Sequence, residues 1–181
     1  CYTDYEYAVI REEVKMYREL GAEGVVIGIL RPDGTLNMEQ MEGLMKEAEG
    51  MSVTLHRAFD VCADPFAALE DAVALGIDTI LTSGQKNSCL EGAKLLRELE
   101  QRSAGRITIQ AGGGVSAEVI GRLAPETGIR AWHLSGKVTL DSSMKYRKEG
   151  VNMGLPSLSE YEIYRTSADK VRAAREMLER K

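Results

Sequence analysis

Short apolar runs recur along this chain at nearly equal intervals, and a helical pattern separates each run from the next. The runs begin near Gly24, Val53, Asp78, Ile107 and Arg130, so their starts differ by 29, 25, 29 and 23 residues. Strands that alternate with helices through short connections form parallel pairs with right-handed crossovers. The spacing therefore predicts an α/β protein built on one parallel sheet.

Each interval also contains a signal for the start of a helix. Six helices are expected, each with a polar residue at its first turn: Thr3, Asn37, Asp64, Ser88, Ser116 and, for the last, about Ser167. Thr3 and Ser88 are followed three residues later by a glutamate, which is the spacing of a capping box. The helix after Ser88 is expected to reach about Ser103, and the last helix is expected to run to the end of the chain.

Within the apolar runs, successive residues alternate between an apolar face and a partly polar face. The apolar face holds Val53, Leu55, Ile107, Ile109, Trp132 and Leu134. The other face holds Thr54, His56, Thr108, Gln110, His133 and Ser135. A doubly wound sheet should be apolar on both faces, whereas a barrel strand can turn a polar face to the lumen. The pattern predicts an α/β (β/α)8 TIM barrel and a single domain over residues 1–181, with the chain covering about the last five βα units and the N-terminal strands absent.

The composition excludes some classes of partner. The formal net charge is −5, whereas a general nucleic-acid or anionic-membrane surface favours a basic face. No apolar run approaches the roughly 20 residues of a membrane span. The three cysteines are too few, and odd in number, for a disulfide framework. We therefore expect a cytoplasmic protein that binds neither nucleic acid nor a membrane.

The stretch VTLHRAFD begins like a buried strand and ends in three ionisable side chains, His56, Arg57 and Asp60. Barrel active sites lie at the C-terminal ends of the strands, so these residues and His133 are the candidate catalytic residues. Each histidine could be an acid, a base, a metal ligand or part of a polar layer inside the barrel. Arg57 and Asp60 could hold an anionic substrate or pair with each other. Strict alternation places Arg57 on the opposite face from His56 unless the strand bends.

A glycine-rich turn, AGGGVS, follows the fourth run. Gly112, Gly113 and Gly114 would let the backbone approach an anion at the start of a capped helix. The loops after the seventh and eighth barrel strands are the usual phosphate site, which would add Ser135. Ser83, at the end of the third run, completes the candidate anion-binding set. The alternative is that the glycines only form a tight turn or give clearance for packing.

The roles of two cysteines and of one long stretch stay open. Cys62 and Cys89 lie near expected helix starts, where the dipole lowers a thiol's pKa and a soft metal or an oxidant could reach them; they could equally be small residues in a cap region. The stretch from Lys137 to Arg165 has no clear periodicity and is expected to be a long loop, which would be a lid, an oligomer contact or disordered.

Four motifs, VTLHRAFD, TILTSGQ, ITIQAGGGVS and AWHLSG, resemble in this order the CutC family of copper homeostasis proteins. The resemblance covers essentially the whole chain. It implies a cytoplasmic barrel that forms a homodimer or higher homo-oligomer and binds copper as Cu(I). The family has a further N-terminal segment that supplies three strands and its proposed ligand cysteines, so Cys1, expected just after the third strand, is the remaining candidate metal ligand.

Three functional hypotheses result. The first is a CutC-like copper homeostasis protein that binds Cu(I). The second is a TIM-barrel enzyme that acts on an anionic or phosphorylated small metabolite at the C-terminal mouth. The mouth residues suit an anion, whereas Cu(I) prefers thiolates and thioethers, so this second hypothesis stays open beside the first. The third is a dimeric scaffold that binds through residues 137–165.

Overall fold

Five short strands form one parallel sheet in chain order in the computed structural model, which describes residues 1–155 and 158–179. The strands are β1 (Gly24–Ile27), β2 (Ser52–Leu55), β3 (Thr79–Thr82), β4 (Thr108–Ala111) and β5 (Ala131–Trp132). The helices before and between them are α1 (Asp4–Glu19), α2 (Met38–Glu47), α3 (Pro65–Ala74), α4 (Ala93–Ser103) and α5 (Ala117–Thr127). Doubly wound sheets reverse their strand order at a switch point, so the sequential order confirms a partial (β/α)8 barrel.

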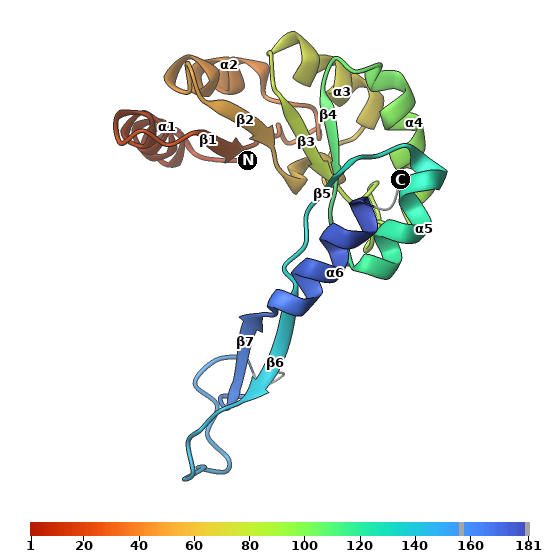
Figure 1. Cartoon of the computed structure of the whole chain (residues 1–181). Coiled ribbons are helices and arrows are strands. Elements are labelled where there is room, and N and C mark those ends of the chain that lie inside the picture. Colours follow the sequence, from red (N-terminus) through yellow and green to blue (C-terminus); the bar gives the residue numbers. More distant parts are fainter. Residues whose placement is uncertain (156–157, 180–181) are drawn as a thin grey trace.

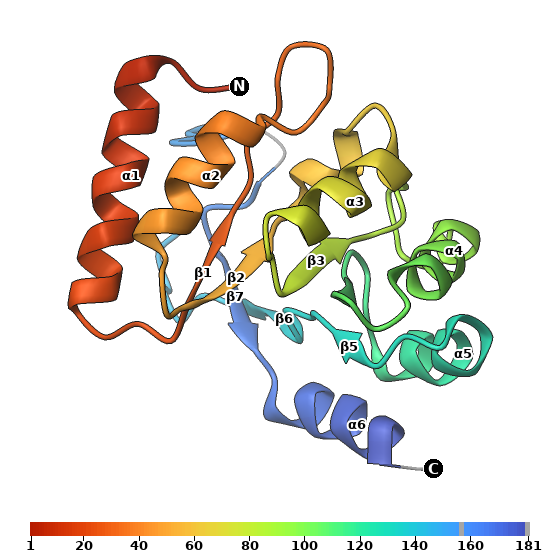
Figure 2. The same cartoon turned by 90° about the horizontal axis from the view of Figure 1, so that it is seen from above.

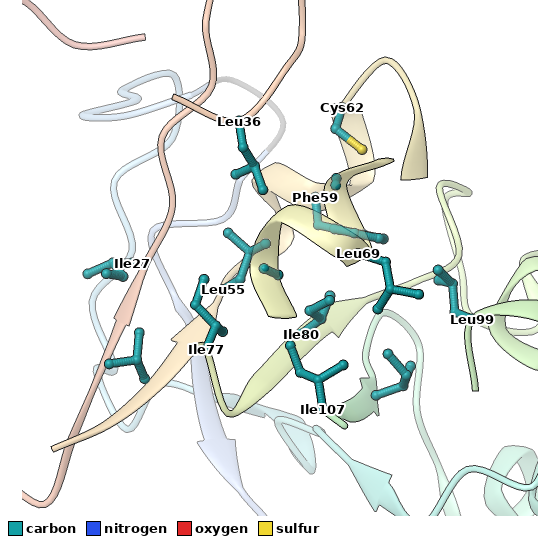
Figure 3. Packing of buried hydrophobic residues seen from close by; sticks show 14 of the residues in the cluster. Ile27, Leu36, Leu55, Phe59, Cys62, Leu69, Ile77, Ile80, Leu99 and Ile107 are labelled. Atoms are coloured by element: carbon teal, nitrogen blue, oxygen red, sulfur yellow. The ribbon is translucent and has the colours of Figure 1, made fainter. Parts of the chain in front are cut away.

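The sheet curves, and the helices lie along its outer side (Figure 2). Leu55 pairs in register with Ile80, and both are fully buried under the helices. Phe59 and Leu69 are fully buried in the same core (Figure 3). The expected apolar face is thus confirmed along β2 to β4. Val26 lies on the opposite, concave face and is 61% exposed, so the barrel lumen is open to solvent in this chain.

The stretch from Lys137 to Arg165 is not only a loop. It contains the antiparallel strands β6 (Lys137–Asp141) and β7 (Glu162–Thr166), which project as a ribbon away from the body (Figure 1). Residues 156–157 lie outside the described part. The sequence prediction did not include these strands because their pattern is short and incomplete: β6 (KVTLD) alternates polar and apolar residues, β7 (EIYRT) does not, and none of their residues is buried.

The helix expected from Ser88 begins later than predicted. The Glu91 N–H donates to the Ser88 hydroxyl, which is one of the two bonds of a capping box, but the Glu91 carboxylate accepts from the Ser88 hydroxyl and not from its backbone N–H, and α4 starts only at Ala93. Gly92 packs so closely on the turn after β3 that an added Cβ would overlap the backbone carbonyl of Ser83. This contact holds the segment in a turn before the helix can propagate.

The remaining helix starts follow the sequence. Thr3 and Glu6 form the complete capping box of α1, and Asp64 caps α3 with Pro65 at its first position. The last helix, α6 (Ala168–Glu179), begins next to Ser167 and packs on α5 (Figure 1), while residues 180–181 lie outside the described part. Within residues 1–155 and 158–179, no helix has the length and hydropathy to cross a membrane.

Candidate functional site

The chain bends sharply where β2 ends. A short 3-10 helix, η1 (Arg57–Val61), follows the strand after one residue. That residue, His56, caps η1: its Nδ1 accepts a hydrogen bond from the backbone N–H of Ala58 at 3.1 Å. The bend carries Arg57 toward β3, so strict strand alternation does not apply to it. Arg57 and Asp60 are thereby brought together at the C-terminal end of the sheet.

Asp60 is the centre of a hydrogen-bond network between η1 and the end of β3. Its carboxylate accepts hydrogen bonds from the hydroxyl of Thr82, from the backbone N–H groups of Ser83 (3.0 Å) and Gln85 (3.2 Å), and from Arg57 Nε (2.6 Å). The Asp60 side chain is only 7% exposed. Burial alone would raise the pKa of this carboxyl, but the hydrogen bonds from Thr82 and Arg57 and from the two amides outweigh it and lower the pKa.

The Arg57 guanidinium is fixed at two nitrogens and open at its remaining edge. Nε donates to Asp60, and Nη2 donates to the hydroxyl of Ser83 at 2.9 Å. Ser83 is fully buried and also bonds the backbone carbonyl of Lys86, whereas 46% of the Arg57 side chain is exposed. Ser83 therefore positions Arg57, and Arg57 is the group that reaches the mouth.

The glycine loop lies directly against this arginine. A Cβ added at Gly113 would sit 3.1 Å from the Cβ of Ser83 and 3.6 Å from Arg57 Nη1. Gly113 and Gly114 both have φ in the left-handed region, at +87° and +76°. No described residue accepts a hydrogen bond from the N–H group of Gly113 or Gly114. The loop therefore brings Gly113, whose N–H group has no partner among the described residues, beside a fixed guanidinium.

Gly112 has a different role. Its N–H donates to the carbonyl of Thr82 at 2.9 Å and continues the pairing of β3 with β4. A Cβ added there would lie 2.7 Å from the Leu81 side chain. Gly112 thus provides packing clearance, which was the alternative interpretation of the glycines, whereas Gly113 lies beside Arg57 and Gly114 beside Ser88.

His56 is half-buried beside the end of β1. A Cβ added at Gly28 would be 2.7 Å from both Nδ1 and Cε1 of the imidazole. Burial lowers the pKa of His56 below its ordinary value. The lowered pKa favours the uncharged imidazole, which packs between η1 and the end of β1.

His133 and Ser135 follow β5 and are exposed. His133 stays close to the glycine loop, because a Cβ added at Gly112 would be 3.8 Å from the His133 Cβ. Ser135 lines a separate cavity of about 330 Å³ together with Ser116 and Lys170. The structure thus groups Arg57, Asp60, Ser83 and Gly113 directly, and places Ser135 at a cavity whose lining does not include Arg57.

The cysteines do not have the low thiol pKa expected of helix N-termini. Cys62 lies at the C-terminal end of η1, and burial raises its pKa to about 11. Cys89 is fully buried before the first turn of α4, and burial raises its pKa as well. Cys1 is exposed. In the part of the chain that the structure describes, no three His, Cys, Asp or Glu side chains are grouped as a metal site.

Gln85 is a structural member of the site to which the sequence prediction gave no role. It has a left-handed φ of +56°, and its side-chain amide donates to the carbonyls of Phe59 (3.3 Å) and Cys62 (3.0 Å). These bonds pin η1 against the turn after β3. The signal that could have found it is the polar run TSGQ directly after a buried strand, facing the acidic end of HRAFD.

The comparisons with known proteins agree with this architecture. The model of the CutC family matches residues 1–138. A CutC family protein of Bacteroides thetaiotaomicron is 43% identical over 171 residues, which are 94% of this chain and 69% of that protein. A CutC family protein of Chromobacterium violaceum is 40% identical over 179 residues, 99% of this chain and 72% of that protein.

A solved structure is also similar. The crystal structure of CutC from Streptococcus agalactiae, which carries a provisional copper homeostasis assignment, matches with a TM-score of 0.70 and 32% identity. The match covers 73% of this chain and 65% of the solved chain, slightly less than two thirds of its length. On the family match and the identity to these relatives, the chain belongs to the CutC family.

Proposed function

We propose that the C-terminal mouth of this barrel binds the anionic group of a small metabolite, and that the protein is an enzyme acting on that metabolite. The observation that carries the proposal is the Arg57 guanidinium, held by Asp60 and Ser83 with its open edge beside Gly113. Phosphate and carboxylate oxygens are the groups that a fixed guanidinium and backbone amides recognise best.

Preorganisation supports this proposal over a purely structural ion pair. An arginine that is already ordered loses little side-chain entropy when it binds a ligand. Asp60 neutralises Arg57 only from the Nε side, which leaves Nη1 beside Gly113, in a loop where the N–H groups of Gly113 and Gly114 have no partner among the described residues. An anion between them would meet donors from both sides. In this arrangement Asp60 and Ser83 are positioning residues, and Arg57 with the two glycines forms the binding surface.

The cavity beside Ser135 extends the proposed binding region. Lys170 and Ser116 line it, and Ser116 is the N-cap of α5, directly downstream of the glycine loop. A ligand whose anionic group occupies the Arg57 position could place a second polar group there. His133, which is exposed and close to Gly112, is the candidate for proton transfer.

The proposal is tested by titrating inorganic phosphate, and then a panel of phosphorylated and carboxylate metabolites, into the chain by NMR. Arg57→Ala should weaken binding at least about 10-fold, because a charged hydrogen bond contributes about 1.5–3 kcal/mol. The control is Arg97→Ala, which removes an exposed arginine of α4 that bonds Glu126 at 2.6 Å. If no anion binds, or if both variants bind like the wild type, the proposal is wrong.

Cu(I) binding is the second candidate, favoured by the copper homeostasis assignment of the Streptococcus agalactiae relative. In this chain the exposed thiol is that of Cys1, and we propose it as the ligand. A Cu(I) competition titration under reducing conditions would compare this chain, its Cys1→Ser variant and the longer Bacteroides thetaiotaomicron relative. Tight binding lost in Cys1→Ser supports the candidate. Absence of tight binding in every sample removes it.

We also propose that the protein is cytoplasmic and self-associates. Its three cysteines are free thiols, which suits a reducing compartment. The ribbon segment exposes large apolar side chains, among them Tyr146 and Met153, which a second copy could cover. Sedimentation should therefore give a dimer or larger species for the wild type and a monomer for a Tyr146→Ser, Met153→Ser variant. A monomeric wild type would contradict self-association.

A further inference from the structure

We propose that His56 is a ligand-binding residue of the mouth that works as a fixed, neutral hydrogen-bond donor through Nε2–H, and not as a general base. This inference rests on the proposed function, because it names a second residue for the same anionic ligand. It assigns to His56 a role opposite to the one usually given to a histidine at the end of a barrel strand, which is to accept a proton.

The hydrogen bond at Nδ1 sets the tautomer. A neutral imidazole has one N–H and one bare nitrogen. Nδ1 of His56 accepts the N–H of Ala58 at 3.1 Å, so Nδ1 is the bare nitrogen and the proton resides on Nε2. Adding a proton to Nδ1 would place two donors against each other and remove the cap of η1. The cap therefore stabilises the neutral form over the cation.

Packing fixes the direction in which Nε2–H points. The imidazole edge formed by Nδ1 and Cε1 lies against Gly28, where any added Cβ would be within 2.7 Å of the ring. His56 backbone N–H donates to the carbonyl of Ile27 at 3.0 Å, so the residue is also held through its main chain. With one ring edge against Gly28, just after β1, and Nδ1 bonded to η1, the ring is held in place, and Nε2 is the ring nitrogen without a partner among the described residues.

The charges around His56 also favour a neutral donor. Its ionisable neighbours in η1 are Arg57 and Asp60, and these pair with each other at 2.6 Å. The Asp60 carboxylate is therefore engaged and does not serve as a counter-ion for an imidazolium. Burial disfavours the charged ring further. No described residue accepts a hydrogen bond from Nε2, so this donor has no partner within the described part of the chain.

The position of His56 matches the proposed ligand. It is the residue immediately before Arg57, at the C-terminal end of β2, in the strand alternation shared with Thr54 on the concave face. An anion bound by Arg57 and the amides of Gly113 carries several oxygens, and one more donor from the β1 side would fix its orientation. A neutral donor does this without changing the protonation state of the ligand.

Two conservative variants separate the two functions of the ring. His56→Asn keeps an acceptor where Nδ1 caps η1 but removes the donor at the Nε2 position. His56→Gln places an amide N–H near the Nε2 position but removes the capping acceptor. We expect His56→Asn to weaken inorganic phosphate binding about 10-fold with a urea midpoint close to that of the wild type. His56→Gln should lower the urea midpoint and retain more of the phosphate affinity.

The tautomer is read directly and without ligand by long-range ¹H–¹⁵N NMR of the imidazole. The expected result at pH 7 is a neutral ring protonated at Nε2. An Nδ1–H tautomer or an imidazolium would overturn the inference. Thr3→Ala, which removes the cap of α1 away from the mouth, is the stability control and should leave phosphate binding unchanged.

The failure of this inference differs from the failure of the proposed function. If phosphate binding is lost in Arg57→Ala but unchanged in His56→Asn, the anion site stands and the role of His56 is wrong. If phosphate does not bind the wild type, or binds equally to Arg57→Ala, the proposed function fails and the ligand role of His56 fails with it. Weakening in both Arg57→Ala and His56→Asn supports both.

Discussion

The strands of the body and the strands of the ribbon are similar in length but bury their side chains very differently. In β2, Val53 is 1% exposed and Leu55 is fully buried beneath the helices. In β7, which has one residue more, every residue is exposed. The body strands are covered by α2 to α5, whereas Figure 1 shows β6 and β7 extending away from every helix of the body. The body is thus held by apolar burial and the ribbon mainly by its own ladder.

This difference coincides with the extent of the family match. The model of the CutC family covers residues 1–138 and so ends at the second residue of β6. Hydrogen bonds at the base of the ribbon tie it to the rest of the chain: Thr166 donates to the carbonyl of Ser135, the Ser167 N–H to that of Gly136 at 2.9 Å, and Lys170 Nζ to that of Lys137 at 2.7 Å. We infer that the body folds as a cooperative unit and that the ribbon opens locally at lower cost.

The largest contrast should come from apolar truncation. Leu55→Ala removes a fully buried side chain from the body and should lower the free energy of unfolding by about 2–5 kcal/mol. Ile163→Ala in the ribbon, where the side chain is 49% exposed, should change it by no more than about 0.5 kcal/mol. Urea denaturation followed by circular dichroism measures both. Equal losses would show that the ribbon belongs to the same cooperative unit.

Two Asp–Arg ion pairs with nearly equal N–O distances, one in the body and one in the ribbon, extend the comparison to charged side chains. Asp60 and Arg57 pair in the body at 2.6 Å, with Asp60 nearly buried, whereas Asp141 and Arg147 pair in the ribbon at 2.7 Å with Asp141 74% exposed. Asp60→Ala should cost about 3 kcal/mol, since it leaves a guanidinium and buried amides without their acceptor. Asp141→Ala should cost less than about 1 kcal/mol.

The same pair of urea experiments in low and high salt sharpens this result. The cost of Asp141→Ala should shrink as salt screens the exposed pair, whereas the cost of Asp60→Ala should change little. A large, salt-independent cost for Asp141→Ala would mean that the ribbon pair is covered, for example by a second copy. A small cost for Asp60→Ala would remove the argument that this carboxylate organises the mouth.

Lowering the pH should remove the contribution of the Asp60 hydrogen bonds to the free energy of unfolding. The folded pKa of Asp60 is below its ordinary value of about 3.9. Its stabilisation is therefore fully present above that ordinary value and is lost as pH falls through the lower, folded pKa. The difference in unfolding free energy between the wild type and Asp60→Asn should be constant from pH 7 to pH 5 and decrease below about pH 4. If the difference already disappears between pH 7 and pH 5, the stabilisation comes from the titration of another group.

Much of the body was predictable because its βα units share one packing requirement. Each βα unit must bury one strand face under a helix, and this need fixes the apolar alternation at Val53 and Leu55 and the polar caps at Thr3 and Asp64. The same logic located the mouth, because parallel strands all end at one edge. The ribbon strands bury no side chain, and only β6, with the five residues KVTLD, alternates polar and apolar residues, which is too short a pattern to distinguish a strand from a loop.

The details of the site were less predictable, for local reasons. Alternation placed Arg57 on the opposite face from His56. In the structure, the His56 side chain caps η1 by accepting from the Ala58 N–H, and the chain bends there. The thiol of Cys62 was expected at a helix N-terminus, yet it lies at the end of η1, where burial dominates its pKa. Turns of a few residues depend on single contacts that no periodic pattern encodes.

The smallest expected contrast concerns cations stacked on aromatic rings. In the body, the Arg102 guanidinium lies 3.7 Å from the centroid of Phe66, a half-buried ring, while in the ribbon Lys137 Nζ lies 4.5 Å from the centroid of Tyr164, an exposed ring. Arg102→Gln should destabilise the protein by about 0.5–1 kcal/mol, and Lys137→Gln by less than about 0.5 kcal/mol, because solvent weakens the attraction in the ribbon. Chemical denaturation with a double-mutant cycle through Phe66→Leu and Tyr164→Leu isolates the two interaction energies. If the ribbon pair proves as strong as the body pair, its ring is shielded from water in solution, and the ribbon is packed against a surface that the isolated chain leaves exposed.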